Sequence, residues 1–349
     1  MKALVFNGPR DIRYEDYPDP ELRTPNSAIV QVKSCSICGS DLHMYHGAHI
    51  GDTDYGEGGT KFCTGHEFIG EVVEAGPDVH GFKVGDQVLA AGGTGCGHCP
   101  ACLTGNAGRC RAATAFGIGP TLEGGQAELV NVPNADATLF STDGLSDDQA
   151  MLLTDAMATA YFGLTRAEPK PGGTVAVVGL GPIGLIGVEL AYALGAAQVF
   201  AIDPVQSRRK MAEKLGATTF APGLDLVPQV REATGGRGAQ SVFEASGASG
   251  AIASVLPLVA HGGNASFIGI PEPEDTLPMP LIMFKNVTVR GGVCDVPNMW
   301  PHLVPMIQSG RIRADNLFTH DFELSEGADA YRLFDSRDEG VVKIRIGVS

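Results

Sequence analysis

The chain is 349 residues long, 44% of them hydrophobic and 19% charged, which allows a large buried core and excludes a disordered protein. Its formal net charge of -15 argues against nucleic acids and anionic membrane surfaces as partners. The sequence has no apolar run of membrane-spanning length and no signal-peptide core after Met1. We therefore expect a cytoplasmic protein whose eight cysteines stay reduced.

The first part of the chain is predicted to be rich in β-strands. Short apolar segments at residues 29–32, 70–74 and 84–88 are separated by Pro and Gly turns. Within this region, Cys38 to His43 contains a thiol, a hydroxyl, a carboxylate and an imidazole, and Gly65 to Glu67 adds a second imidazole and carboxylate. A single Cys is also compatible with a core position, but this grouping of ligand-type side chains favours a functional site.

Four cysteines follow at spacings typical of a metal-binding loop. Cys96, Cys99, Cys102 and Cys110 form the pattern Cys-x2-Cys-x2-Cys-x7-Cys. Four thiolates on one short loop can surround a tetrahedral Zn²⁺ ion. An iron–sulfur cluster is the alternative, but the last spacing and the absence of a following Pro depart from the ferredoxin pattern. We predict a structural zinc site.

After residues 169–173 the pattern changes to alternating strands and helices. Strands are expected at 174–178 and 198–202, and helices at 182–194 and 205–215. Further strands are expected at 242–244 and 265–268. This alternation predicts βαβ units and a parallel sheet.

A glycine-rich turn joins the first of these strands to the first helix. Gly179, Gly181 and Gly184 form the pattern Gly-x-Gly-x-x-Gly, with Pro182 and Ile183 inside it. The first Gly permits a tight turn, the second gives a pyrophosphate access to the backbone, and the third allows the helix to pack closely on the sheet. The helix N-terminus then attracts the phosphates. In this strand–turn–helix context the motif predicts a dinucleotide site.

Asp203 ends the second strand and bears on the choice of dinucleotide. A carboxylate here can accept hydrogen bonds from the adenosine ribose of NAD(H) and would repel the 2′-phosphate of NADP(H). Arg208 and Arg209 lie close by in the sequence, and an Arg can accommodate that phosphate. We expect a preference for NAD(H).

Taken together, these motifs resemble the medium-chain dehydrogenase family, and within it the zinc-containing alcohol dehydrogenases. The resemblance rests on residues 38–43, 65–72 and 179–184 and on the four-cysteine pattern, which occur in the family's order. It extends over essentially the whole chain. It implies an α/β protein in which a GroES-like β-rich catalytic domain accompanies a Rossmann domain with a doubly wound parallel sheet.

The resemblance also implies domain limits. The catalytic domain is expected at residues 1–156 and 293–349, because the C-terminal segment returns to it, with a structural zinc lobe at 92–113. The Rossmann domain is expected at 157–292.

A catalytic zinc ion is implied on Cys38 and His66. The third ligand of the family falls where this chain has Asp155, in a segment without Cys. This resembles the bacterial secondary alcohol dehydrogenases, which use Cys, His and Asp, and a carboxylate is an acceptable zinc ligand. A helix cap is the alternative role for Asp155. Two zinc ions per chain are thus expected.

Several further roles follow from the resemblance alone. Ser40 and His43 match a proton relay, His43 suiting its outer end because an imidazole titrates near neutrality, and Asp41 matches the carboxylate that orients the ligand His. Glu67 matches a residue that can approach the metal. The remaining matched residues, expected to contact the dinucleotide, are Thr159, Arg208, Ile268, Ile270 and Lys343. The segment 268–270 matches one whose backbone holds the carboxamide of the nicotinamide. Lys343 matches a basic residue near the pyrophosphate, unless it is an exposed surface lysine.

The implied activity is hydride transfer between an alcohol and NAD(H), interconverting a secondary alcohol with a ketone or a primary alcohol with an aldehyde. A polyol, sugar or threonine dehydrogenase on the same scaffold is an alternative, as is a formaldehyde dismutase, for which the chain is short. A non-catalytic or zinc-independent quinone-reductase-like relative is disfavoured by the intact Cys38, His66 and Asp155.

The segment from Met44 to Cys63 is a candidate substrate loop, and Cys294 a candidate pocket or subunit contact. A homotetramer is expected before a dimer.

Overall fold

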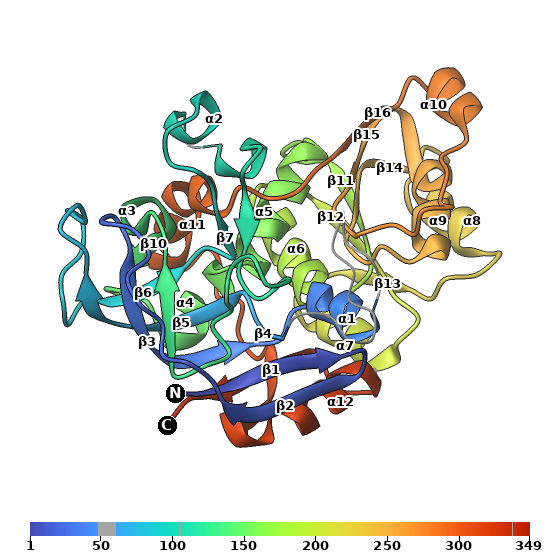
Figure 1. Ribbon diagram of the computed structural model, residues 1–349. Coiled ribbons are helices and arrows are strands. Elements are labelled where there is room, and N and C mark those ends of the chain that lie inside the picture. The colour runs from blue at the N-terminus through green and yellow to red at the C-terminus, as the bar shows by residue number, and fades with distance from the viewer. Residues whose placement is uncertain (48–60, 105, 337) are drawn as a thin grey trace. The chain divides into compact units, whose positions relative to one another are not determined.

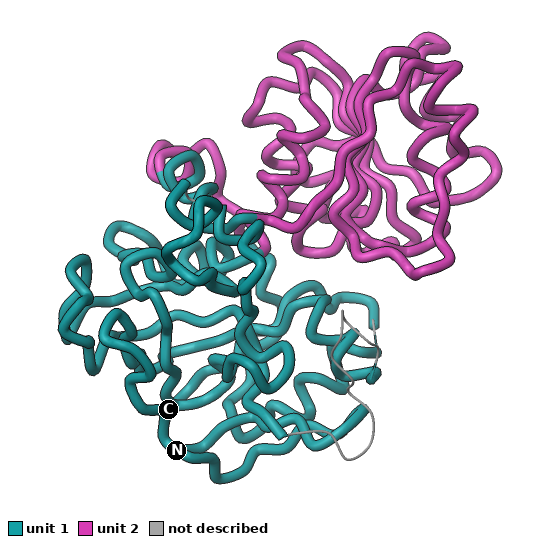
Figure 2. The backbone as a smooth tube through the Cα atoms, turned by 45° about the horizontal axis from the view of Figure 1, so that its top comes forward, with its two compact units in different colours: residues 1–155, 295–304, 316–349 teal, residues 156–294, 305–315 magenta. Residues whose placement is uncertain are grey.

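The computed structural model describes residues 1–47, 61–104, 106–336 and 338–349, so most of the candidate substrate loop lies outside the described residues. The chain divides into two compact units (Figure 2). Unit 1 comprises residues 1–155, 295–304 and 316–349, and unit 2 comprises residues 156–294 and 305–315. The expected limits differ from these by one or two residues, except that 305–315 belong to unit 2.

Unit 1 is built on antiparallel β-structure (Figure 1). Its first elements in chain order are β1 (Lys2–Gly8), β2 (Asp11–Asp16), β3 (Ala28–Ser36), α1 (Gly39–Tyr45), β4 (Phe62–Cys63), β5 (Glu67–Ala75) and β6 (Gln87–Ala90). Next come β7 (Gly93–Thr94), α2 (Pro100–Leu103), the 3₁₀ turn Ala107–Arg109, β8 (Thr114–Ala115), β9 (Leu129–Val132), α3 (Ala135–Thr138), β10 (Leu139–Ser141) and α4 (Asp147–Leu153). The C-terminal part adds the 3₁₀ turn Val296–Met299, the start of α11 (Trp300–Gln308), β17 (Phe318–Glu323), the 3₁₀ turn Leu324–Glu326, α12 (Gly327–Ser336) and β18 (Lys343–Gly347).

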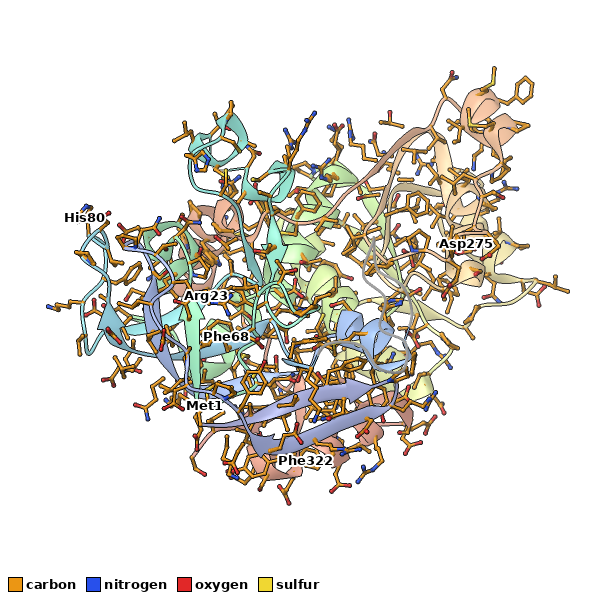
Figure 3. All side chains as sticks on the ribbon, in the orientation of Figure 1. Met1, Arg23, Phe68, His80, Asp275 and Phe322 are labelled. Atoms are coloured by element: carbon orange, nitrogen blue, oxygen red, sulfur yellow. The ribbon has the colours of Figure 1, made fainter. Side chains whose placement is uncertain are left out.

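The main sheet of unit 1 has the order β10-β6-β5-β3-β18-β17, with β9 also pairing with β3. β18 pairs antiparallel with β3, so the C-terminal segment returns to this unit as expected. Alternate residues of β3 and β5 fill one core, in which Phe68, labelled in Figure 3, is fully buried and meets Phe116 edge to face at a centroid distance of 5.3 Å. The sheet therefore gives a rigid base to the loops at the ends of β3 and β5.

One predicted strand begins later than expected. Residues 84–86, predicted to start a strand at 84–88, instead form a turn before β6. Gly85 has a φ of +95°, and the Asp86 carboxylate accepts a hydrogen bond from the backbone amide of Lys83 at 2.9 Å. The Asp86 side chain thus bonds to the backbone of its own turn, and regular strand pairing begins only at Gln87.

Unit 2 is a parallel sheet flanked by helices. Its elements are α5 (Ala156–Arg166), β11 (Thr174–Val178), α6 (Pro182–Ala193), β12 (Gln198–Ile202), α7 (Gln206–Lys214), β13 (Thr218–Phe220), α8 (Leu226–Ala233), β14 (Ala239–Glu244), α9 (Ser249–Leu258), β15 (Val259–Phe267), α10 (Met279–Lys285) and β16 (Thr288–Gly291). The strand order is β13-β12-β11-β14-β15-β16, with every neighbouring pair parallel. The order reverses between β11 and β14, and a Rossmann sheet binds its ligand at the carboxyl ends of the strands beside that switch point.

Candidate functional site

The first cluster of ligand-type side chains forms where β3 ends. Cys38 is the residue before α1, and the Asp41 carboxylate in the first turn accepts a hydrogen bond from the Cys38 amide at 2.8 Å. The other oxygen of Asp41 lies 3.0 Å from Nδ1 of His66, which immediately precedes β5. Asp41 is fully buried, so it fixes both the start of α1 and the orientation of the imidazole. Nε2 of His66 is thereby left as the atom available to a metal.

Asp155 completes this cluster from the residue before α5. Its Oδ2 lies 3.2 Å from Sγ of Cys38 and 3.5 Å from Nε2 of His66, and one donor atom from each of the three residues lies within 4.8 Å of the others. Two ligands placed tetrahedrally at about 2.3 and 2.0 Å from a zinc ion would be roughly 3.5 Å apart. The donor set and its spacing thus fit Zn²⁺, and the carboxylate of Asp155 is turned toward the other two ligands.

Without a metal, the surroundings of Cys38 and His66 favour the protonated forms of both side chains. Burial raises the pKa of Cys38, and the carboxylate of Asp155 raises it further. Burial alone would lower the pKa of His66, but attraction to Asp41 and a hydrogen bond to Asp155 raise it well above its usual value. Metal binding here would release protons, because zinc takes thiolate and neutral imidazole.

Two further candidate residues lie on α1. The Ser40 hydroxyl is 3.3 Å from Nε2 of His66, so it stands beside the atom that would bind the metal. His43 lies one turn further along the helix and is partly exposed. A hydroxyl at the ligand shell and an imidazole nearer to solvent are the chemical groups that a proton relay requires.

Glu67 and Lys343 form a buried ion pair, which corrects the expectation for the lysine. Lys343 was expected near a pyrophosphate or at the surface, but Nζ donates to Oε2 of Glu67 at 2.6 Å and is 1% exposed. The same oxygen accepts a hydrogen bond from the Ser36 hydroxyl. The ammonium is held in the core of unit 1 because it neutralises the fully buried Glu67 next to the ligand His66. Sequence reasoning did not find this pair, whose members are 276 residues apart.

The four cysteines of the loop after β7 also converge. Sγ of Cys102 lies 3.6 Å from Sγ of Cys99 and 3.9 Å from Sγ of Cys96, and all four sulfur atoms lie within 4.8 Å of one another. Four sulfurs at about 2.3 Å around one tetrahedral ion would be roughly 3.8 Å apart. Backbone amides also point at the sulfur atoms, such as that of Ala112 at Cys110. The spacing fits one shared Zn²⁺ ion rather than several irons.

The glycine-rich turn of unit 2 has the geometry of a phosphate-binding loop. Gly179 directly follows β11 with a φ of +87°, and Gly181 is the N-cap of α6 with Pro182 in its first turn. A β-carbon on Gly184 would lie 1.8 Å from the carbonyl oxygen of Gly179, so only Gly allows this approach of helix and turn. The free amides at the start of α6 are thus presented at the carboxyl edge of the sheet.

Asp203 follows β12 at the same edge and is 4% exposed. Its Oδ2 accepts the amide of Leu180 at 2.7 Å, and its Oδ1 accepts the amide of Val205 at 2.8 Å. The guanidinium of Arg209 is bonded to the carbonyls of Asp203 and Pro204, at 2.6 and 2.8 Å. Asp203 therefore joins the glycine turn to the next strand, and Arg209 is oriented toward backbone carbonyls.

The remaining dinucleotide candidates occupy unit 2. Thr159 lies on α5, Arg208 on α7, and Ile268 and Ile270 follow β15, whose carboxyl end is at the same edge of the sheet as the glycine turn. Cys294 is the last residue of the first segment of unit 2 and is partly exposed. No helix in the described residues is long and apolar enough to cross a membrane.

A β-rich unit with a Cys–His–Asp cluster and a four-thiol lobe, together with a Rossmann unit, defines a metal-dependent dehydrogenase. A family model for the alcohol dehydrogenase GroES-like domain matches residues 24–141, and a model for the zinc-binding dehydrogenase matches residues 182–309. The chain is 38% identical to a probable zinc-binding alcohol dehydrogenase of Mycobacterium tuberculosis over 95% of this chain and 84% of that protein. The chain therefore belongs to the zinc-containing alcohol dehydrogenases of the medium-chain family, and it is a zinc-dependent alcohol oxidoreductase.

Other relatives and solved structures agree with this assignment. Sorbitol dehydrogenase of Bacillus subtilis is 30% identical over 95% of this chain and 92% of that protein. The alcohol dehydrogenase of Thermus sp. ATN1 superimposes with a TM-score of 0.91 at 32% identity, each chain fully covered. A putative zinc-binding dehydrogenase of Sinorhizobium meliloti, solved with bound NADP, has a TM-score of 0.85 at 28% identity over 99% of this chain and 98% of that one.

Proposed function

We propose that this protein oxidises secondary alcohols to ketones, and reduces ketones, with NAD(H) as hydride carrier. The observation that carries the proposal is the convergence of Cys38, His66 and Asp155, whose donor atoms lie within 4.8 Å of one another. Three protein ligands leave a fourth tetrahedral position open for a substrate oxygen. Zinc held there would supply Lewis acidity to that oxygen, and NAD(H) held at the Rossmann edge would exchange the hydride.

The residues of the chain have separate tasks in this proposal. Cys38, His66 and Asp155 hold the metal, and Asp41 keeps Nε2 of His66 directed at it. The Ser40 hydroxyl, 3.3 Å from that nitrogen, takes the proton of the substrate hydroxyl. His43 passes the proton to solvent, because an imidazole can accept and release a proton near neutral pH. Glu67, which the resemblance matches to a residue that can approach the metal, is held by Lys343 beside the ligand His66.

We further propose a second, structural zinc on Cys96, Cys99, Cys102 and Cys110, which makes two ions per chain. The glycine turn of residues 179–184 binds the pyrophosphate, and Thr159, Arg208, Ile268 and Ile270 contact the rest of the dinucleotide. NAD(H) is favoured over NADP(H) because Asp203 places a carboxylate at the edge where the adenosine ribose would lie. The assembly expected from the family resemblance is a homotetramer.

A polyol dehydrogenase is the second candidate function. The observation that favours it is the 30% identity to sorbitol dehydrogenase of B. subtilis over 95% of this chain. Both functions use the same metal cluster and the same hydride transfer. They differ in the substituents on the carbon that is oxidised.

The test is a steady-state comparison of primary alcohols, secondary alcohols and polyols, each with NAD⁺ and with NADP⁺. The proposal expects the highest kcat/KM for a secondary alcohol with NAD⁺. A higher value for sorbitol would establish the second candidate, and a higher value with NADP⁺ would contradict the assignment of Asp203. Replacing Cys38 by Ala should abolish turnover with every alcohol while the protein remains folded.

A further inference from the structure

Glu244 is a buried carboxylate for which the proposed chemistry has no use. It is the last residue of β14 and is completely buried. No salt bridge in the described parts of the chain reaches it, and burial raises its pKa, an effect that nearby backbone amides oppose. A buried carboxylate without an ion-pair partner is costly. Packing alone therefore does not explain why a carboxylate occupies this position.

The position of Glu244 gives the first part of that reason. In the sheet its neighbours are Val178 on β11 and Phe267 on β15. Val178 immediately precedes the glycine turn, and Phe267 immediately precedes the segment 268–270. Glu244 thus stands between the two loops that the proposed function assigns to the dinucleotide, at the carboxyl edge of the sheet where a Rossmann fold binds its ligand.

One carboxylate oxygen of Glu244 holds the turn that follows its own strand. Oε1 accepts hydrogen bonds from the amide of Ser246 at 2.8 Å, from the Ser246 hydroxyl at 2.8 Å and from the amide of Gly247 at 2.9 Å. Three donors on one oxygen fix the backbone of residues 245–247, since each bond to an ionised acceptor is stronger than a neutral one.

The other oxygen faces the neighbouring loop. Oε2 has no hydrogen-bond partner in the described residues, and a β-carbon placed on Gly269 would lie 2.7 Å from it. The same β-carbon would lie 1.9 Å from the amide nitrogen of Gly247, so the two loops meet backbone to backbone. One on Gly247 would in turn lie 2.3 Å from the carbonyl oxygen of Ile270. The carboxylate of Glu244 therefore packs against the backbone of residues 268–270.

We propose that Glu244 is a positioning residue that holds the segment 268–270 against the turn 245–247, so that its peptide groups are presented to the carboxamide of the nicotinamide ring. This inference rests on the proposed function, in which Ile268 and Ile270 contact the dinucleotide. Glu244 acts through the backbone of these loops and touches no reacting atom.

The test compares two ligands that differ only in the nicotinamide. NADH and ADP-ribose share the adenosine and pyrophosphate part, and only NADH carries the ring that the segment 268–270 would hold. Glu244→Gln keeps the side-chain volume but removes the negative charge and replaces one of the two carboxylate oxygens by an NH₂ group. We expect it to weaken NADH binding, measured by fluorescence, by roughly tenfold, and to change ADP-ribose binding, measured by calorimetry, by less than about twofold. Gly269→Ala should have the same selective effect, since its β-carbon would displace the segment.

Glu189 provides a matched control. It is a carboxylate of the same unit that accepts the amides of Arg313 and Ala314 at 2.7 and 2.9 Å, and it lies eight residues after Gly181, roughly 12 Å along α6. Glu189→Gln should leave the affinities for both ligands unchanged. Equal losses of NADH and ADP-ribose affinity in Glu244→Gln, or a selective loss in Glu189→Gln as well, would overturn the inference. If the unmodified protein bound neither ligand, the proposed use of NAD(H) would itself be wrong.

Discussion

At the scale of single residues, Lys343 and Glu67 form a buried ion pair next to the metal ligand His66. The two charged atoms of the pair are 2.6 Å apart, and both side chains are almost completely shielded from water. A buried ion pair gives little net stability compared with apolar residues, but removing one partner leaves a charge without compensation. The pair therefore matters more when it is broken than when it is intact.

Lys343→Met should therefore destabilise the protein strongly. Among the described residues, the substitution leaves the buried Glu67 carboxylate with the Ser36 hydroxyl as its one partner. We expect a loss of about 3–5 kcal/mol in the free energy of unfolding, measured with urea. The double variant Lys343→Met/Glu67→Gln removes both charges and should recover most of that loss. If the double variant were as unstable as the single one, packing of the lysine chain, not its charge, would explain the effect.

At this scale the sequence predicts the ligands better than their partners. The grouping of Cys38 with His43 and of His66 with Glu67 is local, so a short motif is enough to reveal it. Asp155 lies in a segment without any metal-binding pattern and is recognisable only through the family resemblance. The pairing of Lys343 with Glu67 is missed because an ion pair across 276 residues depends on β18 returning beside β3, which no local pattern encodes.

At the scale of elements, two cysteines of the four-cysteine lobe, Cys96 and Cys102, differ in the pKa of their thiols. Hydrogen bonds from the backbone of His98 and Cys99 lower the pKa of Cys96 to about 6. Burial raises the pKa of Cys102 to about 12. In the absence of a metal, Cys96 is therefore a thiolate near neutral pH, whereas Cys102 remains a thiol.

Alkylation of the metal-free protein should reveal this difference. After treatment with a chelator, iodoacetamide at about pH 7.5 should modify Cys96 at least about tenfold faster than Cys102, because the thiolate is the nucleophile. Quantitative mass spectrometry of the labelled peptides measures both rates. Zinc added before the reagent should protect both cysteines together, and protection of only one of them would contradict a shared ion.

Regular elements of unit 2 are predicted well, and irregular ones of unit 1 less well. β11 and β12 have the predicted bounds, 174–178 and 198–202, because fully buried parallel strands appear as uninterrupted apolar runs between Gly and Pro. The strand predicted at 84–88 begins at 87, because Gly85 and Asp86 form a turn whose hydrogen bond outweighs the apolar pattern. The extent of β15, from Val259 to Phe267, is also underestimated, since His261 to Asn264 are polar or Gly.

On the scale of the whole molecule, the proposed metal ligands and the proposed dinucleotide-binding turn belong to different units. Each unit has a hydrophobic core of its own: that of unit 1 includes Phe68 and Tyr331, and that of unit 2 includes Phe200 and Val242. The seven proposed zinc ligands are all in unit 1, and the glycine turn is in unit 2. The two kinds of ligand should therefore stabilise different parts of the chain.

Calorimetry with and without each ligand tests this separation. Metal analysis should find two zinc ions per chain, and their removal by a chelator should lower the melting temperature of one transition only, because a metal bound to the folded state alone contributes directly to its stability. NADH at 100 times its dissociation constant should raise the other transition by the equivalent of about 2.7 kcal/mol. Cys96→Ala should lower the melting temperature of the zinc-dependent transition alone, because it removes one ligand of the four-thiol site. Cys38→Ala should lower that melting temperature much less. If chelation shifted both transitions equally, the two units would unfold as one, and the stabilising effect of zinc would extend beyond the unit that binds it.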